Sequence, residues 1–149
     1  MPDTGFRESA PRPSAVAPAA GLARATRILV VEDEPDIGGL IAHALERDGQ
    51  TSVELVPTGD AALAAIAERP PDVVVLDLNL PRLDGYGVLS QLRSRRHTAN
   101  LPVLVLTADG DEESEVRVFQ FGASDFLTKP FRPRALSARL KSLLRRAVS

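Results

Sequence analysis

The chain has 149 residues, of which 44% are hydrophobic and 26% charged, with a formal net charge of −2 and no cysteine. This composition is ordinary for one soluble globular domain, and the lack of cysteine excludes disulfides, thiolate catalysis and cysteine-ligated zinc. No apolar stretch approaches the roughly 20 residues of a membrane helix, and no signal-peptide pattern opens the chain, so a cytoplasmic protein without a membrane partner is expected.

Residues 1–26 are predicted to be disordered and to lie outside the fold. They contain four prolines and many alanines but few large apolar side chains, so they cannot bury enough surface to offset the entropy of ordering. From Arg27 onward, apolar runs alternate with helical patterns. The expected elements, in chain order, are strand 27–31, helix 36–47, strand 52–56, helix 60–68, strand 72–76, helix 85–95, strand 101–106, helix 110–121, strand 124–128 and helix 133–147.

This strict alternation of strands and helices indicates an α/β fold in which helices cover both faces of a parallel sheet. Strand 72–76 is continuously apolar, as expected for a strand that is buried on both faces. In helix 36–47, Leu40 is expected to share the inward apolar face with its isoleucine neighbours. Sites in such sheets form at the C-terminal ends of the strands.

Acidic side chains stand where the first and third predicted strands end. Glu32 and Asp33 follow one apolar run, and Asp77 ends another. Burying a carboxylate is costly unless the group is paired, hydrogen-bonded or bound to metal. If the two strands are parallel neighbours, the three carboxylates converge on one edge of the sheet. Such a cluster predicts a divalent cation and, with it, phosphoryl chemistry.

Two further polar residues are expected at the same edge of the sheet. Thr107 ends the fourth apolar run, and Lys129 follows the fifth predicted strand. An ionised carboxylate such as Asp77 can attack phosphorus and form an acyl phosphate. The lysine ammonium and the threonine hydroxyl can each bind a phosphoryl oxygen, while Mg²⁺ (or Mn²⁺) neutralises the negative charge that the acids add.

Five short sequence motifs contain these residues. They are Val30-Val31-Glu32-Asp33, Val74-Val75-Leu76-Asp77, Pro81-Arg82-Leu83-Asp84-Gly85, Leu106-Thr107-Ala108 and Thr128-Lys129-Pro130-Phe131. In this order they closely resemble the receiver domain of bacterial two-component response regulators, and most closely its winged-helix transcription-factor branch. The resemblance covers residues 27–147. It implies a doubly wound (βα)5 flavodoxin-like fold, a three-layer sandwich whose five-stranded parallel sheet has the order 2-1-3-4-5.

The resemblance also implies a phospho-accepting signalling switch. Asp77 would take a phosphoryl group from the phosphohistidine of a sensor histidine kinase or of a phosphotransfer protein. Mg²⁺ would be bound by Asp33, Asp77 and the backbone carbonyl of Asn79, with Glu32 acting through water. Lys129 would bind the phosphoryl group. The peptide bond between Lys129 and the proline that follows it would be cis.

Thr107 and Phe126 resemble the switch pair of this family. On phosphorylation, the hydroxyl would swing toward the phosphoryl oxygens and the aromatic ring would rotate into the space that it leaves. The last strand and the last two helices would then form the altered surface that controls an output partner or domain.

Two other functions compete with the switch. An aspartate-nucleophile phosphatase would need a second acid two residues after the nucleophile, and the chain has Asn79 there. A receiver-like binding module that is never phosphorylated would not need the full acidic set together with Thr107 and Lys129. The switch is therefore favoured, and no multiple-turnover reaction is expected.

The last helix is basic, with six basic and no acidic side chains in residues 132–149. This charge favours the helix dipole and a solvated outer face, so direct nucleic-acid binding is not expected. The helix resembles one through which the winged-helix branch forms homodimers. Asp125 and Arg139 fit that dimer, whereas Glu115 replaces a basic residue and Ala135 replaces a glutamate. A stand-alone receiver, one cut from a transcription factor, and one from a hybrid kinase all remain open.

Overall fold

The computed structural model describes residues 25–80 and 83–147, so only Ala25 and Thr26 of the segment predicted to be disordered lie within the described residues. In the described part, no helix is long and apolar enough to cross a membrane. The elements are β1 (Thr26–Val31), α1 (Pro35–Glu46), β2 (Thr51–Val56), α2 (Gly59–Glu68), β3 (Val73–Asp77), α3 (Gly85–Ser94), β4 (Val103–Thr107), α4 (Glu112–Gln120), β5 (Asp125–Thr128) and α5 (Pro133–Ala147).

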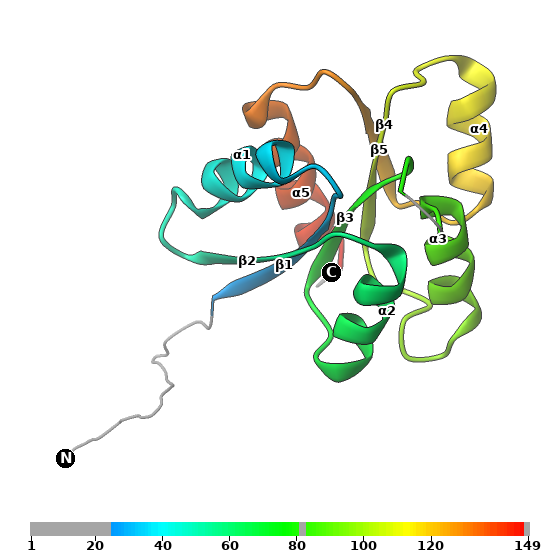
Figure 1. Ribbon diagram of the computed structural model, residues 1–149, viewed down its shortest axis with the longest axis horizontal. Helices are drawn as coiled ribbons and strands as arrows, with labels where there is room; N and C mark the ends of the chain where they lie inside the picture. The colour runs from blue at the N-terminus through cyan, green and yellow to red at the C-terminus, as the bar shows by residue number, and fades with distance from the viewer. Residues whose placement is uncertain (1–24, 81–82, 148–149) are drawn as a thin grey trace.

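The five strands form one parallel sheet in the order β2-β1-β3-β4-β5, which confirms the predicted topology. Helices α1 and α5 cover one face of this sheet, and α2, α3 and α4 cover the other (Figure 1). The strand order reverses between β1 and β3, whose ends pair as Val31 with Leu76. A crevice at the carboxyl ends of these two strands is the usual place for a site in this kind of sheet.

Two apolar layers hold the central strands in place. Val74 and Leu76 pack with α2, α3 and α4, whereas Val73 and Val75 pack with α1 and α5. All five residues of β3 and all five of β4 are buried. Because these two strands are packed on both faces, the residues at their ends have well-defined positions.

The bounds of the elements differ from the predicted ones by at most two residues, and those of α5 agree. Strand β4 begins at Val103 rather than at residue 101, because Pro102 has no amide hydrogen to contribute to the ladder. The carbonyl of Pro102 nevertheless accepts a hydrogen bond from Val74 N at 3.0 Å. Helix α4 begins at Glu112, where the side chain of Asp111 caps it by accepting from Ser114 N.

The prediction for Leu40 is wrong, since this side chain is 70% exposed. The buried residues of α1 are Gly38, Ile41 and Leu45, which form the inward stripe. Leu40 lies one residue, or roughly 100° around the helix axis, from Ile41 and therefore outside that stripe.

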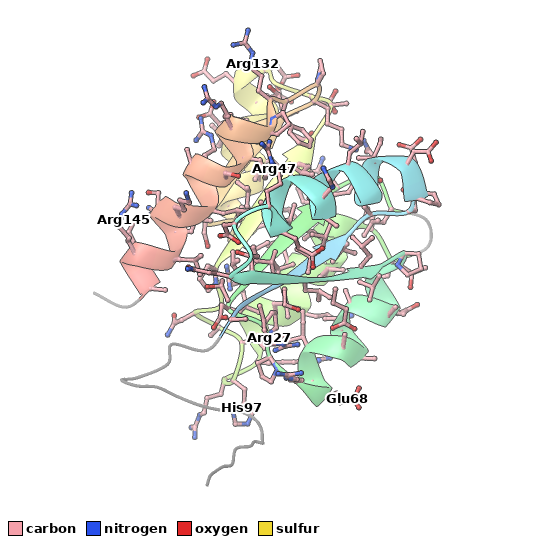
Figure 2. The ribbon with its side chains drawn as sticks, turned by 90° about the vertical axis from the view of Figure 1, so that its left-hand side faces the viewer. Arg27, Arg47, Glu68, His97, Arg132 and Arg145 are labelled. Atoms are coloured by element: carbon pink, nitrogen blue, oxygen red, sulfur yellow. The ribbon has the colours of Figure 1, made fainter. Side chains whose placement is uncertain are left out.

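Helix α5 has the amphipathic character that the sequence predicts. Leu136, Leu140 and Leu143 are buried against the sheet. Arg132, just before α5, and Arg145, near its end, are exposed, and their side chains project outward from the molecule (Figure 2). The basic charge thus lies on the solvent side of this segment.

Candidate metal centre

The residues that were predicted to form a site lie at the carboxyl edge of the sheet. Glu32 and Asp33 directly follow β1, and Asp77 is the last residue of β3. Thr107 is the last residue of β4, and Lys129 directly follows β5. Adjacent residues of a strand point to opposite faces, so both acids after β1 reach the site only because the strand has ended.

The three carboxylates form one cluster. Glu32, Asp33 and Asp77 each offer an oxygen, and these oxygens lie within 4.8 Å of one another. Glu32 and Asp77 are 5% and 2% exposed, whereas Asp33 is open to solvent. Buried like charges this close together disfavour one another's ionised forms unless a cation neutralises them.

Lys129 supplies one positive charge to this cluster. Its Nζ donates to Asp77 Oδ2 at 3.0 Å and to Glu32 Oε1 at 3.5 Å. Burial lowers the pKa of Lys129, but the hydrogen bond and charge of Asp77 and the charge of Glu32 outweigh it, and the pKa lies above its ordinary value. The peptide between Lys129 and Pro130 is cis, as predicted. Lys129 is thus a firmly charged partner for both buried acids.

The carboxyl group of Glu32 has a raised pKa. Burial raises its pKa to about 7, with further contributions from the hydrogen bond and the charge of Asp77. The backbone amide of Glu34, which donates to Glu32 Oε2 at 3.2 Å, and the ammonium of Lys129 act in the opposite direction. When no cation is bound, Glu32 therefore holds a proton at pH values where an exposed glutamate is ionised.

This shift predicts a pH-dependent stability. The folded protein binds the Glu32 proton more tightly than the unfolded chain does, so the free energy of unfolding falls as pH rises from about 4.5 toward about 7. The loss should be roughly 1–3 kcal/mol, since one pKa unit corresponds to ~1.4 kcal/mol. Urea unfolding in a metal chelator at pH 5 and pH 7.5 measures it. In Glu32→Gln, which cannot ionise, the fall in the free energy of unfolding between pH 5 and pH 7.5 should be smaller than in the wild type by that amount. Equal falls in the two proteins would contradict the raised pKa.

Thr107 and Phe126, the predicted switch pair, lie on neighbouring strands. The Thr107 hydroxyl is buried and accepts a hydrogen bond from the backbone amide of Asp109 at 3.0 Å, within the loop that leads to α4. Phe126 is half-buried and packs edge-on against Phe119 of α4, with 5.8 Å between the ring centroids. Each of the two residues therefore contacts α4 or the loop before it.

The oxygen atoms of the cluster are suitable ligands for a divalent cation. If all three carboxyl groups are ionised, the ammonium of Lys129, which pairs with two of them, leaves the cluster with a formal charge of −2. Carboxylate and carbonyl oxygens are the ligands that Mg²⁺ prefers. Asn79 is exposed beside the cluster, and its backbone amide donates to Asp77 Oδ1 at 3.0 Å, which fixes the turn after β3.

Some contributors to the site were missed from the sequence. The amides of Glu34 and Asp109 orient Glu32 and Thr107, but a backbone donor has no signature of its own in a sequence. Gly85 was named only as the last residue of the third motif, with no role of its own. A Cβ atom there would lie 2.7 Å from the Cα of Leu78 and 2.9 Å from the carbonyl oxygen of Asp77, so only glycine permits this close approach beneath the buried acid.

The fold and the site together define a doubly wound α/β protein with an acidic pocket and a lysine at the carboxyl edge of its sheet. The chain belongs to the response regulator receiver domain family, whose model matches residues 28–141. This result confirms the family predicted from the five motifs.

Two transcriptional regulators and one solved receiver domain illustrate the similarity. The chain is 42% identical over 119 residues to the phosphate regulon transcriptional regulatory protein PhoB of Pseudomonas aeruginosa, covering 80% of this chain and 52% of that protein. It is 43% identical over 121 residues to the alkaline phosphatase synthesis transcriptional regulatory protein PhoP of Bacillus subtilis, covering 81% and 49%. The receiver domain of the Francisella response regulator 1452 matches with a TM-score of 0.77 and 32% identity, covering 82% of this chain and 98% of that one.

These similarities confirm the branch as well as the family. PhoB and PhoP belong to the winged-helix branch of response regulators, which is the branch that this chain was predicted to resemble most closely. The chain spans about half the length of these curated relatives.

Proposed function

We propose that this chain is a Mg²⁺-dependent switch that accepts a phosphoryl group on Asp77 from a sensor histidine kinase or a phosphotransfer protein. The observation that carries the proposal is the environment of Asp77. Its carboxylate is buried at the end of β3, lies 3.0 Å from the Lys129 ammonium, and shares a cluster with two further acids. An aspartate with only a structural role would not need this arrangement.

The transfer follows from the positions of these groups. A carboxylate oxygen of Asp77 attacks phosphorus, a phosphorus–oxygen bond forms, the phosphorus–nitrogen bond to histidine breaks, and the imidazole leaves with the bonding electrons. Lys129, which is paired with Asp77 Oδ2, is placed to bind a phosphoryl oxygen. Mg²⁺ (or Mn²⁺) would be held by Asp33, Asp77 and the carbonyl of Asn79, with Glu32 acting through water, and would neutralise charge on the incoming group.

The proposed readout begins at Thr107. Its hydroxyl would leave the amide of Asp109 and bind a phosphoryl oxygen, and the ring of Phe126 would rotate into the vacated space. Because Phe126 packs on Phe119, this change would alter the surface formed by α4, β5 and α5. That surface would control an output partner or domain, and the relatives named as transcriptional regulators favour transcriptional output.

A homodimer through α4, β5 and α5 lacks several of its expected contacts. Glu115 and Ala135 replace two of the charged residues that were expected to link the copies. The remaining pair, Arg139 and Asp125, forms an ion pair within this chain at 3.1 Å. We therefore leave this dimer out of the proposed function.

The two alternative functions find less support at the site. Asn79 stands where an aspartate phosphatase would need its general acid, so a multiple-turnover reaction on a small substrate is not proposed. A binding module without phosphorylation would not need the buried acids and Lys129, which are costly to desolvate.

Removing divalent cations is expected to abolish phosphorylation. Incubation with acetyl phosphate and Mg²⁺ should add a phosphoryl group to the protein, as measured by intact mass. A chelator should reduce the initial rate by at least about 100-fold, because the cation neutralises charge that would repel the phosphodonor. Excess Mn²⁺ should restore the rate, and Asp33→Asn should raise the Mg²⁺ concentration required. Equal labelling with and without chelator would contradict the proposed metal dependence.

A further inference from the structure

The turn after Asp77 contains Asn79, whose backbone carbonyl is the proposed metal ligand outside the carboxylate cluster. This carbonyl accepts no hydrogen bond from the residues that the structure describes. Its position therefore depends on how the flanking residues are held. Leu78 and Leu80 are buried, and Leu78 N donates to the carbonyl oxygen of Leu106 at 3.0 Å. The side of the turn that leaves β3 is thus fixed by burial and hydrogen bonding.

Leu83, four residues after Asn79, lies against the first turn of α2. A Cβ atom added at Gly59, the first residue of α2, would be 2.5 Å from the carbonyl oxygen of Leu83 and 2.8 Å from Cγ2 of Val88. Nonbonded heavy atoms are in optimal contact only at about 3.5–4.0 Å. Because the nearer contact is with a backbone atom, rotation of a side chain cannot relieve it.

Gly87, in the first turn of α3, makes a second close contact with Leu83. A Cβ atom at position 87 would lie 2.5 Å from Cδ1 of Leu83. The amide of Gly87 donates to Oδ1 of Asp84, which caps α3, at 3.0 Å. Leu83 thus contacts glycines at the starts of two helices on the same face of the sheet (Figure 1). We call Gly59, Leu83 and Gly87 the Leu83 cradle.

The first turn of α2 is itself firmly placed. The side-chain oxygen of Thr58 caps the helix by accepting from Ala61 N at 3.1 Å. Ala62 and Ile66 are buried in the core layer between α2 and the sheet. A side chain at position 59 would therefore displace Leu83 rather than α2.

A displacement of Leu83 reaches the proposed metal ligand through Gly85. Gly85, two residues after Leu83, donates from its amide to the carbonyl oxygen of Leu78 at 3.2 Å. Leu78 directly precedes Asn79 in the chain. The cradle is therefore connected to the Asn79 carbonyl by one hydrogen bond and a short stretch of backbone.

We propose that Gly59 and Gly87 are positioning residues for the metal: by holding Leu83, they place the Asn79 carbonyl for Mg²⁺ in preference to larger cations. This inference deepens the proposed function and rests on its metal site. Mg²⁺ requires nearly octahedral oxygens at about 2.1 Å, whereas Ca²⁺ accepts about six to eight oxygens at about 2.3–2.6 Å in flexible arrangements. Displacement of the carbonyl should therefore weaken Mg²⁺ binding much more than Ca²⁺ binding.

Cation binding by Gly59→Ala tests the proposal directly. Dissociation constants for Mg²⁺ and Ca²⁺ follow from the dependence of urea unfolding on cation concentration. Gly59→Ala should raise the Mg²⁺ constant by about tenfold or more and the Ca²⁺ constant by less than about threefold. Gly39→Ala, at an exposed position of α1 where an added Cβ has no neighbour within 4 Å, should change neither. Unchanged Mg²⁺ affinity, or equal losses for both cations, would overturn the proposal.

A second pair of substitutions tests the cradle through the side chain of Leu83 and serves if Gly59→Ala does not fold. Gly87→Ala should weaken Mg²⁺ binding by roughly threefold to tenfold, because it displaces Cδ1 of Leu83. Leu83→Ala should also weaken it, since the segment loses a packed side chain. In the Leu83→Ala background, Gly87→Ala should cause no further loss, because the contact has been removed. Additive losses would show that Leu83 is not the link and would contradict the cradle.

Two further measurements separate the positioning role from a structural role and from the proposed function. Leu143→Ala removes a buried side chain of α5 on the other face of the sheet. It should lower the stability in urea without changing the ratio of the Ca²⁺ and Mg²⁺ constants, and the same change of ratio as in Gly59→Ala would overturn the positioning role. A wild type that binds Mg²⁺ but is not labelled by acetyl phosphate would overturn the proposed function alone.

Discussion

Asp77→Asn is expected to abolish phosphorylation by acetyl phosphate. The amide lacks the anionic oxygen that attacks phosphorus, so the initial rate should fall by at least about 1,000-fold, as it does when a nucleophile is removed from a catalytic group. The fold should persist, because the amide oxygen can still accept from the backbone amide of Asn79. Intact mass after incubation with Mg²⁺ and acetyl phosphate measures the result.

Two comparisons make this result interpretable. Asp60→Asn removes an exposed acid in the first turn of α2 and should be labelled at the wild-type rate. The metal-free stability of Asp77→Asn should equal or exceed that of the wild type, since the substitution removes one of two buried carboxylates that repel each other. Persistent labelling of the asparagine variant would show that the acceptor lies elsewhere.

Lys129→Met is expected to change both activity and stability. Loss of the ammonium removes one stabilising contact to the phosphoryl oxygens, and labelling should slow by about 100- to 1,000-fold. It also leaves the buried acids Glu32 and Asp77 without the half-buried ammonium that pairs with them, which should lower the free energy of unfolding by roughly 2–4 kcal/mol at pH 8. At pH 5 the destabilisation should be smaller, because Glu32 can then carry a proton.

The chain contains its own control for this variant. Lys141, the other lysine, is exposed on α5, and Lys141→Met should leave the labelling rate and the stability close to the wild-type values. Addition of Mg²⁺ should recover part of the stability lost in Lys129→Met by replacing the missing positive charge. Wild-type labelling in Lys129→Met would contradict the role proposed for the ammonium.

The course of the chain was predictable because local patterns and global topology agree. Continuous apolar runs marked the buried strands, and acids at the ends of two such runs together indicated a site at the edge of the sheet. Asp77 and Glu32 could therefore be placed together although 45 residues separate them in sequence. The motif around Lys129 supplied the remaining charge.

Other features could not be obtained from the sequence for physical reasons. Leu40 is an apolar residue of the type that usually lies in the core, and only the packing of α1 against the sheet shows that it lies outside the buried stripe. The hydrogen-bond partners of Arg93, at the end of α3, are backbone carbonyls, which every residue possesses, so no pairing pattern predicts them. The proton on Glu32 depends on the combined burial and charge of three side chains, which spacing alone does not give.

Locating the phosphoryl group on the wild-type protein tests the central claim most directly. After reaction with acetyl phosphate and Mg²⁺, borohydride reduces an aspartyl phosphate to homoserine, and peptide mass spectrometry identifies the converted residue. The proposed function predicts conversion at Asp77 alone, with none when a chelator is present. Conversion at another acid, or no conversion of a protein that retains its fold and binds Mg²⁺, would contradict it.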